Sequence, residues 1–368
     1  MNSDSKPLLS VRGLEVVFPT PIGMVRAVDG VSFDLEAGQS LGIVGESGSG
    51  KTVTAKTLMN LLPSHAMVEG SAHFDGYDLR ALAAGNKPAK HLWGVEIAMI
   101  FQDPMTSLNP VKKVGEQIAE SVRYHLGRTR KEARRRAGEL LEQVGVPEPG
   151  RRLDEYPHQL SGGLRQRVVI AAALACRPRV LIADEPTTSL DVTVQKRILD
   201  LLDELRAESG MSLILVTHDL GVVKGRTDEV MVMYAGRTME EAATAEIFAE
   251  QRHPYTEALI ETIPRIDSAS HTRLLPIPGQ PPVMTSPPSG CSFVDRCRYA
   301  TELCVSEVPI LKSHGAERQV ACHTPVGSTS AEESLRGNMA QGYTFTGLEL
   351  CGSSQPEPTG EDGVGGRP

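Results

Sequence analysis

Residues 45–52 read Gly45-Glu46-Ser47-Gly48-Ser49-Gly50-Lys51-Thr52 and fit the pattern G-x-x-x-x-G-K-T in full. The glycines allow the backbone to wrap closely around a dense anion with its N–H groups pointing inward. We expect Lys51 to reach the β- and γ-phosphates of a bound triphosphate and the Thr52 hydroxyl to hold Mg²⁺. A strand-like run at 39–44 precedes the loop and a helical pattern at 52–62 follows it. The motif binds phosphate in this strand–loop–helix context, where the helix N-terminus adds partial positive charge.

A second buried strand is predicted at residues 179–185, which read Arg-Val-Leu-Ile-Ala-Asp-Glu. Four consecutive apolar residues suit a strand that is covered on both faces of a parallel sheet. The run brings Asp184 and Glu185 to the carboxyl end of the strand, where open α/β sheets bind ligands. We expect Asp184 to lie near Mg²⁺, and Glu185 to face the γ-phosphate and polarise the attacking water.

A third motif, Leu160-Ser161-Gly162-Gly163-Leu164-Arg165-Gln166-Arg167, precedes an apolar segment that reads as a buried helix. It therefore forms another helix N-terminus that can face phosphate. The motif resembles the LSGGQ signature of ATP-binding cassette (ABC) ATPases, with Leu164 in place of the usual fifth residue. The resemblance implies that Ser161, Gly162 and Gly163 contact the γ-phosphate of the nucleotide on an opposite subunit.

Three further stretches resemble elements of the same family. Phe101-Gln102-Asp103-Pro104 resembles the Q-loop, which implies that Gln102 contacts Mg²⁺ or the lytic water and reports the nucleotide state to membrane subunits. Thr188-Ser189-Leu190-Asp191 resembles the D-loop at the dimer interface, so that Asp191 joins the nucleotide-binding residues. His218 follows a buried-strand run and is placed like the switch histidine that contacts the γ-phosphate.

The family also implies an aromatic side chain stacked on adenine. Phe18 lies 27 residues before Gly45, which is the position of that aromatic in the family. Phe33 is the alternative, and either residue can instead belong to the core.

The resemblance spans roughly residues 8–325 and narrows to the oligopeptide/dipeptide/nickel branch of importer ATPases. It implies a dipeptide-type ATPase subunit that couples ATP hydrolysis to uptake of dipeptides or oligopeptides, with nickel or another small solute as the alternative. The implied partners are a homologous second ATPase subunit, two transmembrane permease subunits and, indirectly, an extracytoplasmic solute-binding protein. The branch is indicated by Phe101-Gln-Asp-Pro-Met-Thr-Ser-Leu-Asn-Pro, Tyr156-Pro-His-Gln-Leu-Ser-Gly-Gly, His253-Pro-Tyr-Thr-Glu-Ala-Leu and Pro276-Ile-Pro-Gly-Gln-Pro-Pro.

Composition bounds the protein class and its location. The 368 residues carry a net charge of −8 and 40% hydrophobic residues, which supports a normal core and gives no general attraction to nucleic acid or anionic lipid. No apolar run reaches the ~18 residues that a transmembrane helix needs, and the first residues lack a signal peptide's basic and apolar regions. We therefore expect a peripheral protein on the cytoplasmic face of the membrane, attached through its partners.

The chain divides by composition into three parts. Residues 1–245 are predicted to form an α/β P-loop NTPase domain of the ABC type, with a mixed sheet core, an antiparallel β subdomain and a helical subdomain at about 105–165. Residues 246–324 are predicted to form a small C-terminal domain, and residues 325–368 a disordered tail. Basic residues at 128–136 predict an amphipathic helix with a solvated face. A headgroup or partner contact is the alternative, while nucleic acid is disfavoured because no aromatics lie among the arginines.

Four of the six cysteines form a cluster in the sequence, Cys291, Cys297, Cys304 and Cys322. A cytosolic chain should not depend on disulfides, and four converging thiolates suit tetrahedral Zn²⁺ or an Fe–S cluster. The branch resemblance implies a 4Fe–4S cluster, with Zn²⁺ and unmetallated thiols left open. Cys176 and Cys351 are interpreted as inert.

Two other protein classes share a phosphate loop. A soluble ABC ATPase that acts on DNA or ribosomes usually carries coiled coils or paired cassettes, and this sequence predicts neither. A non-catalytic regulatory subunit would have an altered residue at position 185 or 218, whereas Glu185 and His218 are both present.

Overall fold

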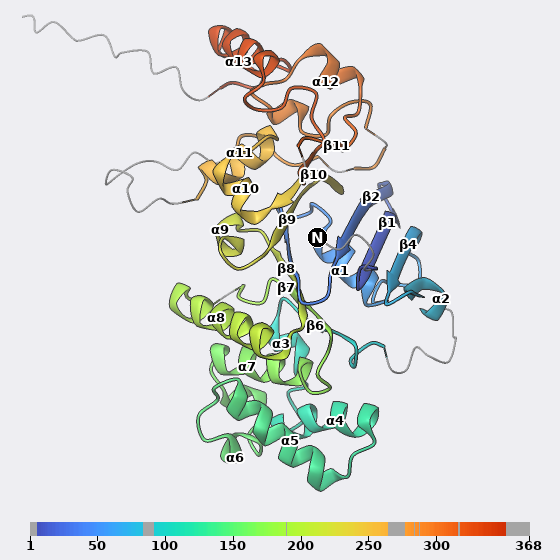
Figure 1. Cartoon of the computed structure of the whole chain (residues 1–368), viewed down its shortest axis with the longest axis vertical. Coiled ribbons are helices and arrows are strands. Elements are labelled where there is room, and N and C mark those ends of the chain that lie inside the picture. The colour runs from blue at the N-terminus through green and yellow to red at the C-terminus, as the bar shows by residue number, and fades with distance from the viewer. Residues whose placement is uncertain are drawn as a thin grey trace, which may run out of the picture.

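The computed structural model describes residues 6–83, 92–188, 190–263, 277–282, 284–286, 288–315 and 317–350. The described chain contains a large mixed sheet, a smaller antiparallel sheet beside it and a helical region beyond one end of the large sheet (Figure 1). This arrangement confirms the predicted α/β class with its antiparallel and helical subdomains.

The large sheet has eight strands, which are β3 (Ser40–Val44), β6 (Ile97–Ile100), β7 (Val180–Asp184), β8 (Ser212–Thr217), β9 (Glu229–Tyr234), β10 (Arg237–Ala243), β11 (Lys312–Ser313) and β12 (Gln319–Val320). Their order is β11-β12-β10-β9-β3-β8-β7-β6. Strand β3 runs parallel to both of its neighbours, since Leu41 pairs with Ile214 of β8 and with Glu229 of β9. Strands β3, β6, β7 and β8 are buried along their whole length, as their apolar runs predict.

The small sheet has the order β2-β1-β4-β5 and is antiparallel. Its first two strands form a long hairpin in which Leu9 pairs with Leu35 and Thr20 with Gly23. Apolar residues of this sheet pack with one face of the large sheet and with helix α1 (Lys51–Leu58) in a single hydrophobic cluster. The strands are β1 (Leu9–Thr20), β2 (Gly23–Leu35), β4 (Met67–Phe74) and β5 (Tyr77–Asp78).

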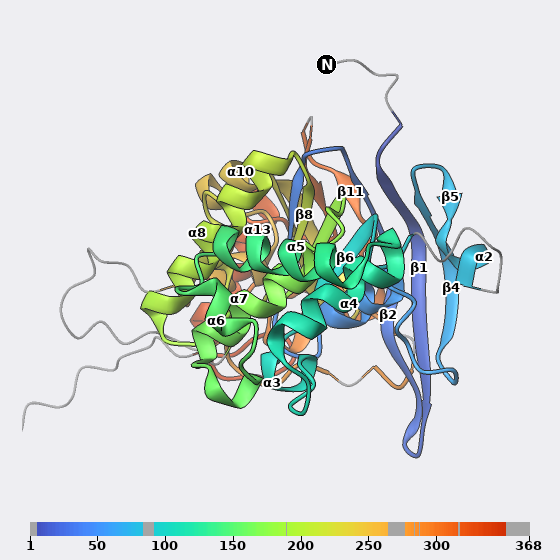
Figure 2. The same ribbon diagram turned by 90° about the horizontal axis from the view of Figure 1, so that it is seen from below.

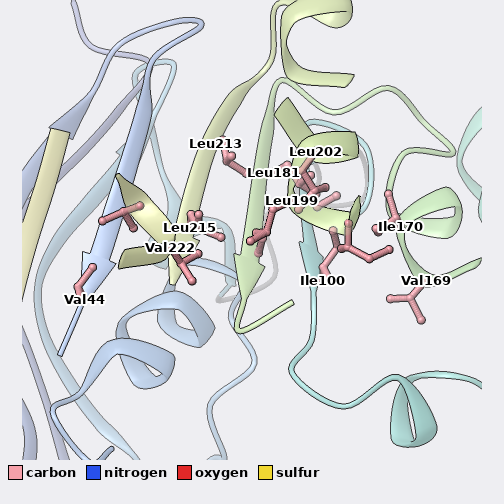
Figure 3. Packing of buried hydrophobic residues seen from close by; sticks show 14 of the residues in the cluster. Val44, Ile100, Val169, Ile170, Leu181, Leu199, Leu202, Leu213, Leu215 and Val222 are labelled. Carbon is pink, nitrogen blue, oxygen red and sulfur yellow. The ribbon is translucent and has the colours of Figure 1, made fainter. Parts of the chain in front are cut away.

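The opposite face of the large sheet packs against helices. Figure 3 shows Leu181, Leu213 and Leu215 of the sheet near Leu199 and Leu202 of the long helix α8. Seen from below, α7 and α8 lie on the side of the large sheet that is away from the small sheet (Figure 2). The helices before the C-terminal region are α2 (Leu79–Ala83), α3 (Pro104–Ser107), α4 (Val114–Leu126), α5 (Arg130–Gln143), α6 (Pro149–Arg152), η2 (Pro157–Gln159), α7 (Gly162–Ala173), α8 (Val192–Ser209) and α9 (Leu220–Val223).

Helix α5 contains most of the basic run at 128–136 and is amphipathic, as predicted. Thr129 and Glu132 form a reciprocal capping box that fixes its start. Ala133, Ala137, Leu140 and Leu141 face the core, whereas basic residues on the other side pair with carboxylates. These pairs are Arg130–Glu116, Arg134–Asp154, Arg135–Glu139 and Arg136–Glu139.

The C-terminal region continues the large sheet. Strand β12 pairs with β10, with Glu240 opposite Val320. The fully buried Glu240 carboxylate accepts hydrogen bonds from the backbone N–H groups of Arg252 and His253, each at 2.9 Å, and pairs with Arg318 at 3.5 Å. The compositional boundary at residue 245 is therefore crossed by shared strands and hydrogen bonds. The remaining helices are α10 (Thr244–Ala249), α11 (Pro254–Glu261), η3 (Val294–Arg296), α12 (Glu302–Ser306) and α13 (Thr329–Gln341).

Helix α13 differs from the disorder predicted for residues 325–368. Ser328 caps its start by accepting from the N–H of Ala331, which is itself fully buried. The Asn338 amide donates to the carbonyl oxygens of Arg298, at 2.9 Å, and Ala300, at 3.1 Å. A mostly polar sequence can therefore dock through one cap, one amide and a few apolar side chains, Ala331 and Leu335 among them, which barely change its composition. Residues 351–368, including Cys351, lie outside the described residues.

Glu241 of β10 provides a pH-dependent test of the sheet. Burial raises its pKa to about 7, Glu229 and Asp34 add to the shift, and Arg12 opposes it. The pKa of Glu241 in the folded protein lies above its ordinary value of 4.5. The contribution of the protonated Glu241 to folding stability is therefore complete below pH 4.5 and is lost as the pH rises through about 7.

We therefore predict that Glu241→Gln stabilises the protein at about pH 8, by on the order of 2 kcal/mol, and has little effect at about pH 4.5. Denaturant unfolding at both pH values measures this difference. The exposed Glu204→Gln variant is the control and should show no such pH dependence. Equal stability of Glu241→Gln and wild type at the higher pH would contradict the assignment.

Candidate active site

The phosphate loop connects β3 to α1 and has a buried lysine beneath it. Lys51 is 4% exposed. Its Nζ donates to the carbonyl oxygens of Gly45 at 2.7 Å and Glu46 at 2.9 Å. Burial lowers the pKa of Lys51, while the carboxylates of Glu185, Asp184 and Glu46 oppose that shift. The ammonium group is therefore held inside the loop and surrounded by acidic groups.

Two glycines of the loop lie against other strands. Gly50, which caps α1, has a φ of +99°, and a Cβ at this position would lie 2.4 Å from the carbonyl oxygen of Ala27. A Cβ on Gly45 would lie 2.1 Å from the carbonyl oxygen of Met233. The obstacles are backbone atoms, so a side chain would displace the loop. These positions explain why the motif needs glycine here.

Two of the three residues predicted to lie at Mg²⁺, Thr52 and Asp184, contact each other. The Thr52 hydroxyl donates to Oδ1 of Asp184 at 2.9 Å. Asp184 is 1% exposed, and this burial raises its pKa, although the Thr52 hydrogen bond opposes the shift. A buried carboxylate beside a hydroxyl is a donor set that suits Mg²⁺.

Three side chains converge on one oxygen of Glu185. Oε2 lies 2.9 Å from Nε2 of Gln102, 2.9 Å from the hydroxyl oxygen of Thr188 and 3.3 Å from Nδ1 of His218. Gln102, Glu185 and His218 follow β6, β7 and β8, which are adjacent, so their carboxyl ends bring these residues to one edge of the sheet. The structure therefore brings together all three residues that the sequence predicts to be catalytic.

Thr188 was not among the predicted site residues, although it lies in the D-loop stretch. Its hydroxyl is positioned by a local turn, in which the Thr188 N–H donates to the carbonyl oxygen of Glu185 at 3.2 Å. The spacing of three residues between Glu185 and Thr188 is the one signal in the sequence that could have indicated this contact. A hydroxyl three residues after a carboxylate can reach it across a turn.

Glu46 faces the C-terminal region. Its backbone N–H donates to the hydroxyl of Tyr255 at 2.8 Å, and its carboxylate pairs with Arg296. Tyr255 is fully buried in the first turn of α11. His253 caps this helix, because its Nδ1 accepts from the N–H of Tyr255 at 3.0 Å. Burial lowers the pKa of His253 to about 3, which keeps this cap neutral. The loop motif predicts that Glu46 lies at the phosphates, but nothing in the sequence indicates its contacts with Tyr255 and Arg296.

The two candidate aromatics for adenine differ in burial. Phe33 is 4% exposed and belongs to the core of the small sheet. Phe18 is partly buried on the β1–β2 hairpin, with its ring centroid 6.2 Å from that of His65. Phe18 is therefore the aromatic that has free surface for stacking.

The signature and the D-loop lie against each other. Ser161 caps α7 and accepts from the N–H of Leu164, and a Cβ on Gly163 would lie 2.9 Å from Cγ1 of Val194. Asp191 caps α8 by accepting from the N–H of Val194 at 3.0 Å. In Figure 1, α7 belongs to the lower helical region, whereas α1 lies beside the small sheet. Ser189 lies outside the described residues.

The four clustered cysteines are within electrostatic range of one another. Burial raises the pKa of Cys291 to about 11 and that of Cys322 to about 12, and neighbouring thiols add to both shifts. Cys297 and Cys304 are also buried. Thiols are suitable ligands for zinc or iron, but among the described residues no group of three or more cysteine, histidine or acidic side chains is arranged to hold a metal ion.

Comparisons with known proteins identify the family of this chain. A family model for ABC transporters matches residues 28–188, and one for the oligopeptide/dipeptide transporter C-terminal region matches residues 239–304. The oligopeptide transport ATP-binding protein OppD of Haemophilus influenzae is 52% identical over 81% of this chain and 91% of the relative. The dipeptide transport ATP-binding protein DppD of Escherichia coli is 47% identical over 87% of this chain and 97% of the relative.

Solved structures show the same fold. A dimeric post-hydrolysis state of the ATP-binding cassette MJ0796, bound to ADP and Pi, matches with a TM-score of 0.56 and 26% identity, covering 64% of this chain and 98% of the other. CbiO1 from Clostridium perfringens matches with a TM-score of 0.54 and 28% identity, covering 67% and 92%. The chain belongs to the ABC transporter ATPases, in the family of oligopeptide and dipeptide transport ATP-binding proteins.

None of the described helices combines the length and the apolar character that crossing a bilayer requires.

We predict that Gly50→Ala weakens ATP binding. The new methyl group adds a backbone clash to left-handed strain, so the loop shifts and loses hydrogen bonds to phosphate. The Kd for ATP should rise by about tenfold or more, because one such bond contributes ~1.5 kcal/mol.

Gly76→Ala is the matched control. It has a φ of +81° and nothing within 4 Å of the added Cβ, so it carries the strain without the clash and lies outside the loop. Titration of both variants with ATP compares them. Wild-type affinity in Gly50→Ala would show that close backbone approach is not needed.

Proposed function

We propose that this chain is the ATP-hydrolysing subunit of a membrane importer for dipeptides or oligopeptides. The observation that carries ATP hydrolysis is the convergence of Gln102, Thr188 and His218 on the Glu185 carboxylate, beside the phosphate loop. The peptide assignment is supported by relatives at 47–52% identity whose names specify oligopeptide or dipeptide transport, and by the matching C-terminal region.

Each residue of the site has a proposed role. Thr52 and Asp184, with Gln102, would hold Mg²⁺, which supplies positive charge to the phosphates. Lys51 and the loop N–H groups bind the β- and γ-phosphates, and His218 contacts the γ-phosphate. The three contacts described on Glu185 fall on Oε2, so we assign Oε1 to the attacking water, which it orients and deprotonates.

The assembly follows from the separation of the signature from the phosphate loop. Ser161, Gly162 and Gly163 begin α7 in the helical region, where they are exposed or partly exposed to a partner. We propose that two homologous ATPase subunits pair head to tail, so that the signature and Asp191 of one face the nucleotide of the other. A matching cassette has been solved as a dimer. ATP then holds the pair closed, and hydrolysis releases it.

We propose that this pair drives two permease subunits at the cytoplasmic face of the membrane. An extracytoplasmic solute-binding protein would deliver the solute, so this chain need not contact it. The two homologous ATPase subunits can be identical or distinct chains, and purification of the assembly would distinguish these cases.

Reconstitution of the assembly in membrane tests the function. We predict that peptide-loaded binding protein stimulates ATP hydrolysis, while nickel-loaded binding protein does not. Stimulation by nickel alone would move the chain to the metal branch and leave the nucleotide site unchanged. Failure to co-purify with any permease would favour a soluble ABC ATPase.

In the same assay, Glu185→Gln should keep ATP binding and lose hydrolysis at this chain's own site by more than about 10²-fold, because an amide cannot accept the proton of water. The exposed Glu208→Gln variant is the control and should retain wild-type turnover. Normal hydrolysis by Glu185→Gln would identify another residue as the base.

We further propose that Cys291, Cys297, Cys304 and Cys322 bind a 4Fe–4S cluster, with Zn²⁺ as the alternative. Four cysteines close enough to influence one another, three of them buried, support this proposal. A bound metal would stabilise a region with little core of its own. Metal analysis of anaerobically purified protein should find iron with acid-labile sulfide, and Cys297→Ser should remove it. Protein with neither iron nor zinc would end the metal proposal.

A further inference from the structure

The phosphate loop has an ionic contact with a distant part of the chain. Arg296 lies in the cysteine segment, defined here as residues 291–304, and its guanidinium binds the Glu46 carboxylate in a bidentate manner. Nη1 lies 2.6 Å from Oε2 and Nη2 lies 2.9 Å from Oε1. Arg296 is 6% exposed, so this pair is shielded from solvent on the arginine side.

The guanidinium is held in place by further partners. Nη1 donates to the hydroxyl of Tyr234 at 3.1 Å, and Nε donates to the carbonyl oxygen of Pro278 at 2.7 Å. Its carbon lies 5.6 Å from the ring centroid of Tyr234 and 5.9 Å from that of Phe293. A guanidinium with this many partners has one orientation, so it fixes Glu46 rather than following it.

Glu46 itself is held at both ends. Its carboxylate is bound by Arg296, and its backbone N–H by the Tyr255 hydroxyl. Its carbonyl oxygen accepts from Lys51, the residue expected to bind phosphate. The position of Glu46 is therefore coupled directly to the position of the phosphate-binding lysine.

The sign of the charge at residue 46 matters for a loop that binds an anion. An unpaired carboxylate within the loop repels a triphosphate, and this repulsion is strong in the low dielectric of a partly closed site. We propose that Arg296 is a positioning residue for ATP: by holding the Glu46 carboxylate it cancels a negative charge in the phosphate loop, so that the cysteine segment sets the affinity of the chain for ATP.

This role of Arg296 rests on the proposed binding of ATP and does not depend on which solute is transported. A merely structural role for Arg296 would also make its removal destabilising, so stability does not separate the two roles. The two roles differ in how the loss of affinity depends on the number of phosphates in the ligand. Repulsion by Glu46 acts on the phosphate charge and not on adenosine.

The experiment measures binding of a non-hydrolysable ATP analogue, ADP and adenosine to the full-length chain and its variants. Arg296→Ala should weaken binding of the ATP analogue by about tenfold or more, weaken ADP binding less and leave adenosine binding unchanged. Glu46→Gln should tighten binding of the ATP analogue, because Arg296 then acts without its counter-charge. Glu46→Gln combined with Arg296→Ala should return the affinity close to that of wild type.

Arg298→Ala is the matched control in the same segment. Arg298 also pairs with two carboxylates, Glu257 at 2.8 Å and Glu261 at 2.7 Å, but these belong to α11 and not to the loop. It should lower the melting temperature without changing the affinity for the ATP analogue.

Three results would overturn the proposal. They are unchanged affinity for the ATP analogue in folded Arg296→Ala, an equal loss of affinity in Arg298→Ala, and no recovery on adding Glu46→Gln. If Arg296→Ala does not fold, the Glu46→Gln variant decides alone, since weaker or unchanged binding of the ATP analogue contradicts the proposed sign of the charge effect.

Discussion

The burial of β3 between two parallel strands is the constraint on which the nucleotide site depends. Hydrogen bonds to β8 and β9 fix the direction of this strand, and the absence of solvent on either face leaves it no alternative register. The phosphate loop therefore leaves the sheet at the same edge at which β6, β7 and β8 deliver Gln102, Asp184, Glu185 and His218. The chemistry of the site is a consequence of where four adjacent strands end.

The parts of the site that the sequence could predict are those in which a residue's role follows from its position after a strand. The loop glycines, Lys51 and the Asp184–Glu185 pair belong to this group, since short apolar runs locate the strands. Thr188 was missed because its contact depends on the turn made after β7, which a strand pattern does not specify. Distinguishing Phe18 from Phe33 required burial, because both residues lie in strands with the same alternating pattern.

Contacts over long sequence separations could not be predicted. Tyr255 lies 209 residues from Glu46, and Arg296 lies 250 residues from it. The same limitation affected the domain boundary, because composition changes near residue 245 while β12 returns to pair with β10. In the tail, composition indicated disorder, but Asn338 anchors α13 to two carbonyl groups of the cysteine segment region. Backbone hydrogen bonding and single polar anchors leave almost no trace in composition.

The long separation between Glu46 and Arg296 has a consequence for biosynthesis. Protein synthesis proceeds from the N-terminus, and domains generally fold as units as they emerge. The phosphate loop is therefore made well before the guanidinium that neutralises its glutamate, and nascent or prematurely terminated chains carry the loop sequence with an uncompensated negative charge. On the proposed role of Arg296, a chain that ends before residue 296 carries the complete loop motif but binds ATP more weakly than a chain that contains this arginine.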